Sequence, residues 1–188
     1  MNTFFKYIHV YFSLTIYRLE LIMKNIVFQP ISNPLAQEHF FTTIKHGVNI
    51  SELKSFISDS YYKQLASLYP TGNIRVWGVT NGKNNVNERK WQKISSGDVV
   101  LFFGKGGVSS CATITATLKS KDLAKFLWGT DSANNCWENI YFLNNICEMH
   151  IPYKHLNNAL NYKENYVVHG FSVLGPELNE KITAEFNL

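Results

Sequence analysis

Short apolar runs alternate with polar turns along most of the chain, and this pattern predicts a structure built largely from strands. The clearest run is VVLFFG at 99–104, which follows the turn residues Gly97 and Asp98. Because its apolar character is unbroken, we expect a strand that is buried on both faces. The same features predict strands at 40–45, 73–79, 111–118 and 138–146, with a hairpin turn at 104–110.

Helix signals fall between these runs. Asn49 is a predicted N-cap, because Glu52 follows three residues later and can complete a capping box. That helix is expected to continue or restart through 60–69 and to stop at Pro70. Further helices are predicted at 87–94, at 120–128 with Ser120 as N-cap, at 152–160, and at 176–186 with Pro176 at its first position.

Strands therefore outnumber long helices, and short turns join most of them. This organisation predicts an α+β fold, a curved mixed sheet or small open barrel with helices packed outside it. Residues 25–37 carry Pro30 and Pro34 and are expected to be irregular. The predicted domain spans 24–170, and 171–188 is either a C-terminal helix or a linker.

The first residues, 1–23, form a leader that resembles a signal peptide, with Lys6 before an apolar stretch. Polar residues interrupt that stretch, and it is too short and too polar to span a bilayer. Met23 begins an ordinary-looking start, so the leader is expected to be an over-extended gene start, a disordered segment or a loosely attached helix.

Composition narrows the class of protein. The formal net charge of +4 and the pI of about 8.9 are compatible with a polyanionic partner. The three Cys residues are odd in number and lack CxxC spacing, so we expect no disulfide scaffold and a reducing cytoplasmic location. The His residues lack metal-ligand spacing, which predicts neither a metal nor a cofactor.

Recognisable catalytic groups are missing. The aspartates are scattered, whereas a metal-dependent nuclease needs clustered carboxylates. FGKGGV at 103–108 lacks the spacing of a P-loop, and GxSxG does not occur. Cys111 and Cys136 are interpreted as small buried residues. The sequence therefore favours a binding domain over an enzyme.

The tryptophans carry the functional hypothesis. All four lie between residues 77 and 137, and Trp77, Trp128 and Trp137 occur at the ends of predicted elements beside Gly or Asn-rich loops. Trp91 lies within a helix pattern and is interpreted as a core anchor. Rings at strand ends can fill a core or can hold another flat ring, and both interpretations of Trp77 stay open at this point.

The stretch RVWGVTNGKNNVNERKWQKISSGDVVLFF at 75–103 resembles the PUA-like group that contains the EVE and YTH domains. FFTTIKHGVNISEL at 40–53 is similar to the first EVE strand and the helix start after it, and LWG at 127–129 with WENIYFL at 137–143 looks like a later part of that group. The order of these motifs is closest to the modified-base sensor domains fused to McrB-like restriction NTPases or to nucleases. The resemblance covers about residues 38–150.

The resemblance implies an aromatic cage for a flipped base. Trp77 falls at the first ring, Trp128 at the second, Trp137 at a third wall, and Gly78 and Val79 where backbone groups meet the base edge. Further candidate hydrogen-bonding groups are Thr43, Asn81 and Asn84, and candidate phosphate-binding residues are Lys83, Arg89, Lys90, Lys93 and Lys105.

The leading hypothesis is a non-catalytic domain that flips out N6-methyladenine or a modified cytosine in DNA and thereby targets a restriction NTPase or nuclease subunit. The alternatives are a PUA-like RNA reader, a small-molecule or nucleotide sensor that uses the same cage, and an enzyme whose site the sequence does not reveal. No membrane partner is expected.

Overall fold

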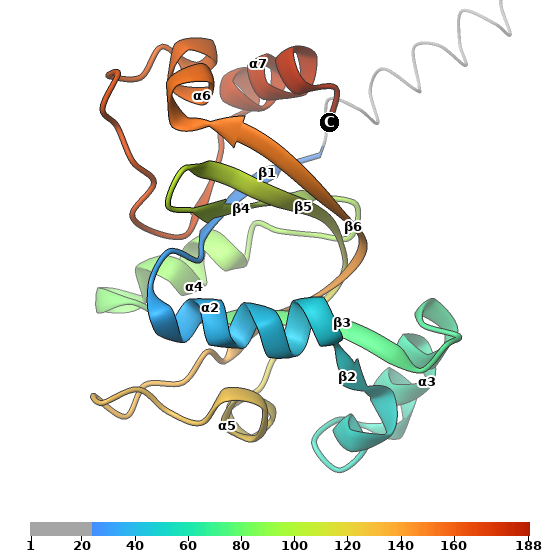
Figure 1. The fold of residues 1–188 in the computed structure, drawn as a ribbon. Helices are drawn as coiled ribbons and strands as arrows, with labels where there is room; N and C mark the ends of the chain where they lie inside the picture. The colour runs from blue at the N-terminus through green and yellow to red at the C-terminus, as the bar shows by residue number, and fades with distance from the viewer. Residues whose placement is uncertain (1–23) are drawn as a thin grey trace, which may run out of the picture.

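The computed structural model describes residues 24–188, and its centre is one seven-stranded mixed sheet (Figure 1). The strand order is β2-β3-β6-β5-β4-β1-β7. β1 runs parallel to β4, and every other neighbouring pair is antiparallel. The strands are β1 (Ile26–Pro30), β2 (Val48–Asn49), β3 (Asn73–Val79), β4 (Val99–Gly104), β5 (Gly107–Lys119), β6 (Asn139–Pro152) and β7 (Ser172–Val173).

The sheet is strongly curved because its two longest strands, β5 and β6, are bulged against each other. Their register shifts between Val108 and Ser110 and at two further places along the pair. Each extra residue bends its strand and increases the local twist. Figure 1 shows both strands sweeping from the upper part of the molecule to the lower part. The expected α+β fold with a curved mixed sheet and outer helices is confirmed.

Helices surround this sheet. They are α2 (Pro34–Phe40), α3 (Asp59–Leu68), α4 (Val86–Trp91), α5 (Lys121–Trp128), α6 (Tyr153–Leu160) and α7 (Pro176–Phe186), with a π-helical turn η1 (Phe41–His46) and 3-10 turns η2 (Ile50–Leu53) and η3 (Lys83–Asn85). In Figure 1, α2 and η1 form one rod across the front, α5 lies below it, and α6 and α7 lie at the top.

The predicted first strand at 40–45 is wrong, because these residues continue helix α2 as η1. Asn33 caps α2 by accepting a hydrogen bond from the Ala36 amide at 2.8 Å, and Pro34 occupies the first position. The buried residues His39, Phe40, Thr43 and Ile44 recur as adjacent pairs four positions apart, which is the spacing of one helix face.

The expectation of an irregular segment at 25–37 is also wrong. Ile26–Pro30 forms β1, which pairs along its length with β4. Pro30 is tolerated at the end of this strand because a proline there removes only a terminal amide donor. The partner strand lies far away in the sequence, so local pattern alone gives little sign of the pairing.

Other local predictions are confirmed. Asn49 and Glu52 form the expected capping box, although they begin the short turn η2 and the longer helix restarts at α3. Residues 100–103 of β4 are all 0% exposed. Val100 and Phe102 enter a core cluster under α2, while Leu101 and Phe103 enter another under α6 and α7, so β4 is buried on both faces.

The cysteines differ from the expectation. Cys111 and Cys147 are directly paired across β5 and β6, with Cα atoms 5.3 Å apart, and they form a disulfide. The expectation of no disulfide is wrong, because the bond depends on strand pairing that spacing in the sequence does not reveal. Cys136 is free and buried, as predicted.

The sequence predicts separate segments at the two ends of the chain. Residues 171–188, interpreted as a helix or a linker, contain β7, which pairs with β1, and α7, whose Ile182 is completely buried in the core cluster under α6 and α7. The leader at 1–23 lies outside the described residues. Within 24–188, no helix has the length and apolar character needed to cross a bilayer.

Candidate functional site

The candidate site lies at the carboxyl end of β3, where this strand has a free edge. β2 pairs only with Asn73 and Ile74, so Arg75–Val79 pair with β6 on one side alone within the described chain. Trp77 and Val79 face the core cluster under α2. Side chains alternate along a strand, so Gly78 faces the opposite side, toward Trp128 and Trp137.

Because Gly78 has no side chain, Trp128 and Trp137 can pack very close to the backbone of β3. A Cβ atom added there would lie 2.3 Å from the carbonyl oxygen of Trp137 and 2.8 Å from the Cζ3 atom of Trp128. Neither distance is possible for a real side chain, so only glycine fits. This packing brings the three predicted ring residues to one strand end, from β3, the end of α5 and the loop before β6.

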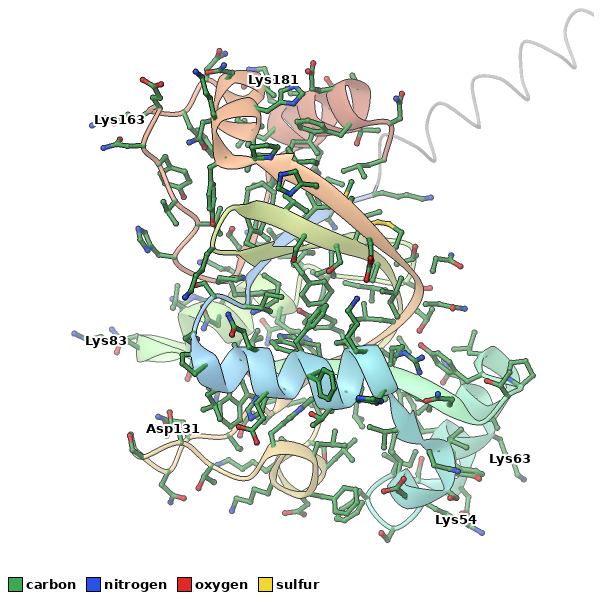
Figure 2. All side chains as sticks on the ribbon, in the orientation of Figure 1. Lys54, Lys63, Lys83, Asp131, Lys163 and Lys181 are labelled. Atoms are coloured by element: carbon green, nitrogen blue, oxygen red, sulfur yellow. A yellow bond between two sulfur atoms is a disulfide. The ribbon has the colours of Figure 1, made fainter. Side chains whose placement is uncertain are left out.

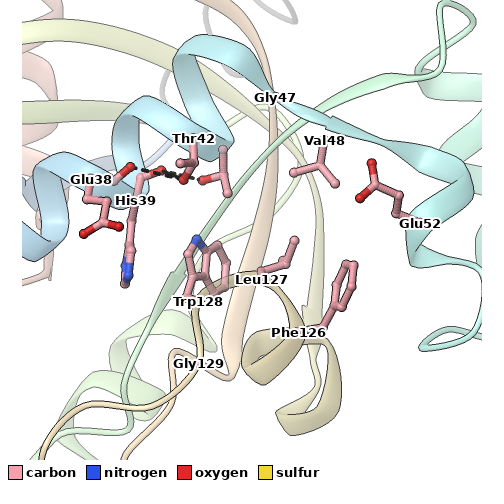
Figure 3. Close-up of a pocket in the computed structure, with 11 residues that line it drawn as sticks. Glu38, His39, Thr42, Gly47, Val48, Glu52, Phe126, Leu127, Trp128 and Gly129 are labelled. Atoms are coloured by element: carbon pink, nitrogen blue, oxygen red, sulfur yellow. Dashed lines mark hydrogen bonds between the residues drawn. The ribbon is translucent and has the colours of Figure 1, made fainter.

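A fourth ring, His39 of α2, lies among the three indoles and was not singled out in the sequence. Its centroid is 4.6 Å from that of Trp137 in an edge-to-face arrangement, 6.1 Å from that of Trp128 and 6.5 Å from that of Trp77. Figure 3 shows the His39 side chain beside Trp128. One sequence signal could have revealed His39. Asn33 and Pro34 mark the start of a helix, and a helix that begins there has His39 on its buried face.

Backbone contacts hold His39 in place. The hydroxyl of Thr43 donates to the His39 carbonyl oxygen at 2.9 Å, and the Thr42 hydroxyl donates to the same oxygen at 3.1 Å. Both threonines belong to η1, and π-helical turns inside helices often mark functional sites. Burial lowers the pKa of the His39 imidazole, with an opposing contribution from Glu38, so the ring is mainly neutral at neutral pH.

Two cavities meet at this histidine. One, of about 300 Å³, is lined by Trp77, Gly78, Val79 and Trp137 together with residues of β1, α2 and the 169–171 loop. The other, of about 520 Å³, lies between α2, η1 and α5 and is lined by Trp128 and Thr43 (Figure 3). His39 is the one residue that both linings share. Both volumes fall in the range that is usual for ligand pockets.

The indole nitrogens distinguish these rings from ordinary core tryptophans. Nε1 of Trp77 and Nε1 of Trp128 are buried and have no hydrogen-bond partner within residues 24–188. By contrast, Nε1 of Trp91 donates to the Ile140 carbonyl at 3.1 Å, as expected for a core anchor. A buried donor without an acceptor costs about 1–3 kcal/mol. A ligand with an acceptor atom at this place would remove that cost.

The ring of Trp77 is covered by protein in this conformation. The residue is 3% exposed, and the ring centroids of Phe40 and Phe102 lie 6.2 Å and 5.7 Å from that of Trp77. Trp77 is thus both a core residue and a wall of the smaller cavity.

The candidate polar residues do not lie together in the structure. Asn81 lines neither cavity, because it donates to Glu138 at 2.8 Å and accepts from Asn139 at 2.8 Å in a buried polar cluster. Asn84 is exposed on η3, and its carbonyl accepts from Arg89 at 2.6 Å. Asn87, which the sequence did not single out, lines the smaller cavity.

The candidate phosphate-binding residues all lie outside the cavities. Lys83, Arg89, Lys93 and Lys105 are exposed, and Lys90 donates to the Phe171 carbonyl at 2.8 Å. None of the five makes an ion pair within residues 24–188. Figure 2 shows Lys83 on the same side of the molecule as Asp131, which lines the smaller cavity.

Other places in the described chain have fewer groups that could bind a ligand. A third cavity of about 600 Å³ is larger, but its aromatic residue Tyr69 already has partners, Thr115 at 2.5 Å and the Leu143 carbonyl at 3.0 Å. Within 24–188, no three His, Cys, Asp or Glu side chains are grouped so that they could hold a metal ion.

Comparison with known proteins finds similarity to solved structures but no match to a family model or a curated sequence. Among solved structures, it is similar to the N-terminal domain of Thermococcus gammatolerans McrB bound to m5C DNA, with a TM-score of 0.65 and 18% identity over 87% of this chain and 98% of that chain. At this identity the match shows a shared fold.

Proposed function

We propose that this chain is a non-catalytic domain that binds DNA carrying a modified base and holds that base, flipped out of the helix, among Trp77, Trp128 and Trp137. The observation that carries the proposal is the pair of buried indole N–H groups that have no acceptor within residues 24–188, on Trp77 and Trp128, whose rings lie 6.5 Å and 6.1 Å from the same His39 ring. Filling a core does not require such donors.

The chemistry of a nucleobase matches this site. A base is flat and presents carbonyl or ring-nitrogen acceptors at its edge, and stacking on an aromatic side chain contributes about 1–3 kcal/mol. An added methyl group contributes only about 0.8 kcal/mol when buried. Discrimination must therefore come from hydrogen bonds to the base edge, where a mismatch leaves a buried group unpaired. The free edge of β3 at Gly78 would supply backbone groups for this purpose, whereas the Val79 carbonyl already accepts a hydrogen bond from the Asn139 side chain at 3.2 Å.

The structural neighbour supports the proposal, since a domain of the same fold is described as bound to m5C DNA. We propose N6-methyladenine or a modified cytosine as the base and a cytoplasmic restriction NTPase or nuclease, on another chain or domain, as the partner. The exposed cations Lys83, Arg89, Lys93 and Lys105, with Lys90, would hold phosphates. In this proposal Asn81 holds the end of β3 through its hydrogen bonds to Glu138 and Asn139, and it does not contact the base.

The test is binding to short oligonucleotides that contain one N6-methyladenine, one 5-methylcytosine or no modification, as DNA duplex, single-stranded DNA and RNA. We expect preference for a modified DNA. Trp77→Phe and Trp128→Phe keep a ring but remove the N–H, so each should weaken binding by about fivefold to thirtyfold, equivalent to about 1–2 kcal/mol.

Trp91→Phe is the matched control, because Trp91 lies outside both cavities and its N–H is bonded to protein. It should lose stability without losing the preference for modification. Equal binding to modified and unmodified DNA would refute the proposal. Preference for modified RNA over modified DNA would support an RNA reader instead.

A further inference from the structure

We infer that His39 is a displaceable residue that occupies the base site in the free protein and moves toward the larger cavity when a base binds. This inference rests on the proposed function, because it concerns the same site. Because the imidazole must first move, a base binds only if its binding free energy exceeds the cost of that movement.

The position of the ring is the first reason. His39 lies within 4.6–6.5 Å of all three indole centroids, so a base that stacked among these rings would meet the imidazole. The indoles themselves are divided between two cavities, with Trp77 and Trp137 on one side and Trp128 on the other. His39 alone borders both, so its movement would join them into one site that all three rings line.

The second reason is that the displaced ring has a suitable destination. The larger cavity, about 520 Å³, is lined by Glu38 and Glu52, and neither forms an ion pair within residues 24–188. The Glu52 carboxylate accepts from the Asn49 amide at 3.3 Å and lies across the cavity from His39 (Figure 3), so Glu38 is the nearer acceptor. An imidazole there could donate to a carboxylate. In the present position, its nitrogens make no hydrogen bond to the described protein, and 7% of the residue is exposed.

The third reason concerns protonation. Burial among the indoles lowers the pKa of His39 and outweighs the opposing effect of Glu38, whereas relief from that burial in the larger cavity, beside Glu38, would favour the imidazolium. Protonation therefore favours the displaced position. The displaced fraction should rise as the pH falls from the ordinary value of 6.5 through the lowered pKa. The other titratable groups that border the two cavities are Asp131 and His169.

Two substitutions separate displacement from a fixed stacking role. His39→Ala removes the obstructing ring, so it should tighten binding of methylated single-stranded DNA by about tenfold, since a minor open state populated at about 10% reduces apparent affinity by that factor. His39→Phe retains a ring that cannot charge, so it should bind no better than wild type and should lose the dependence on pH. The probes are single-stranded oligonucleotides with one N6-methyladenine or 5-methylcytosine, which need no flipping, and the matching deoxynucleosides, which have no phosphate.

A measurement without ligand completes the test. Quenching of tryptophan fluorescence by acrylamide should increase on acidification below pH 6.5 in the wild type and stay constant in His39→Phe, which retains Glu38, Glu52, Asp131 and His169. The inference requires both results, the tighter binding by His39→Ala and the pH-dependent quenching in the wild type. Weaker binding by His39→Ala, or identical pH profiles for wild type and His39→Phe, overturns it. If wild type binds no modified probe, the proposed function fails with it, whereas failure of the ligand-free arm alone refutes only the displacement.

Discussion

The contact at Gly78 gives the sharpest test of the site geometry. Gly78→Ala would put a methyl group 2.3 Å from the Trp137 carbonyl oxygen and 2.8 Å from Trp128. The first neighbour is backbone, so it cannot move away by a simple change of rotamer. Overpacking of this kind costs about 1–3 kcal/mol, and we expect the upper part of that range. For a chain of this size, each 1 kcal/mol lowers Tm by about 2–4 °C, so a loss of about 4–12 °C should follow.

The assay is thermal unfolding of Gly78→Ala alongside Gly104→Ala, in which the added Cβ has room, since its nearest neighbour is Ser109 at 3.8 Å. The control should unfold near the wild-type temperature. Because the methyl group pushes the Trp128 ring and the Trp137 backbone away from β3, Gly78→Ala should also bind modified DNA at least tenfold more weakly under conditions where it stays folded. A Gly78→Ala protein with wild-type Tm and wild-type binding would refute the close packing of Trp128 and Trp137 against Gly78.

Three further outcomes concern the scaffold. Asp98→Ala should lower the free energy of unfolding, measured with urea, by about 3 kcal/mol, because the buried carboxylate accepts from the Asn25 and Ser95 amides at 2.8 Å each. Reduction of the Cys111–Cys147 disulfide should cost about 2–4 kcal/mol, given the 36-residue separation, and should be visible as a lower Tm in dithiothreitol. Burial raises the pKa of Tyr69 from 10.0 to about 12. Stability is therefore full below pH 10 and falls between about 10 and 12, by at most about 1.4 kcal/mol per pH unit for this group, and Tyr69→Phe should remove that contribution.

Much of the scaffold could be predicted because its signals are local. The apolar run of β4 reports burial on both faces, and Ser120 at the start of α5 caps the helix by accepting from the Leu123 amide at 3.2 Å. Such features depend on neighbouring residues in the chain, so a single sequence contains them. The same reason explains the failure at 40–45, where β-branched and aromatic residues suggested a strand but the Asn33 cap and tertiary packing decided in favour of a helix.

By itself, the sequence determined which segments are strands or helices for most of the chain, and the resemblance of its motifs to a known group predicted Trp77, Trp128, Trp137 and Gly78 as one site. Only the tertiary structure decided that His39 lies among these indoles, that Asn81 is held by Glu138 and Asn139, and that Cys111 meets Cys147. These contacts join residues that are distant in the chain. Their distances follow from how the bulged sheet curves and where helix α2 crosses its edge, and no local pattern encodes that geometry.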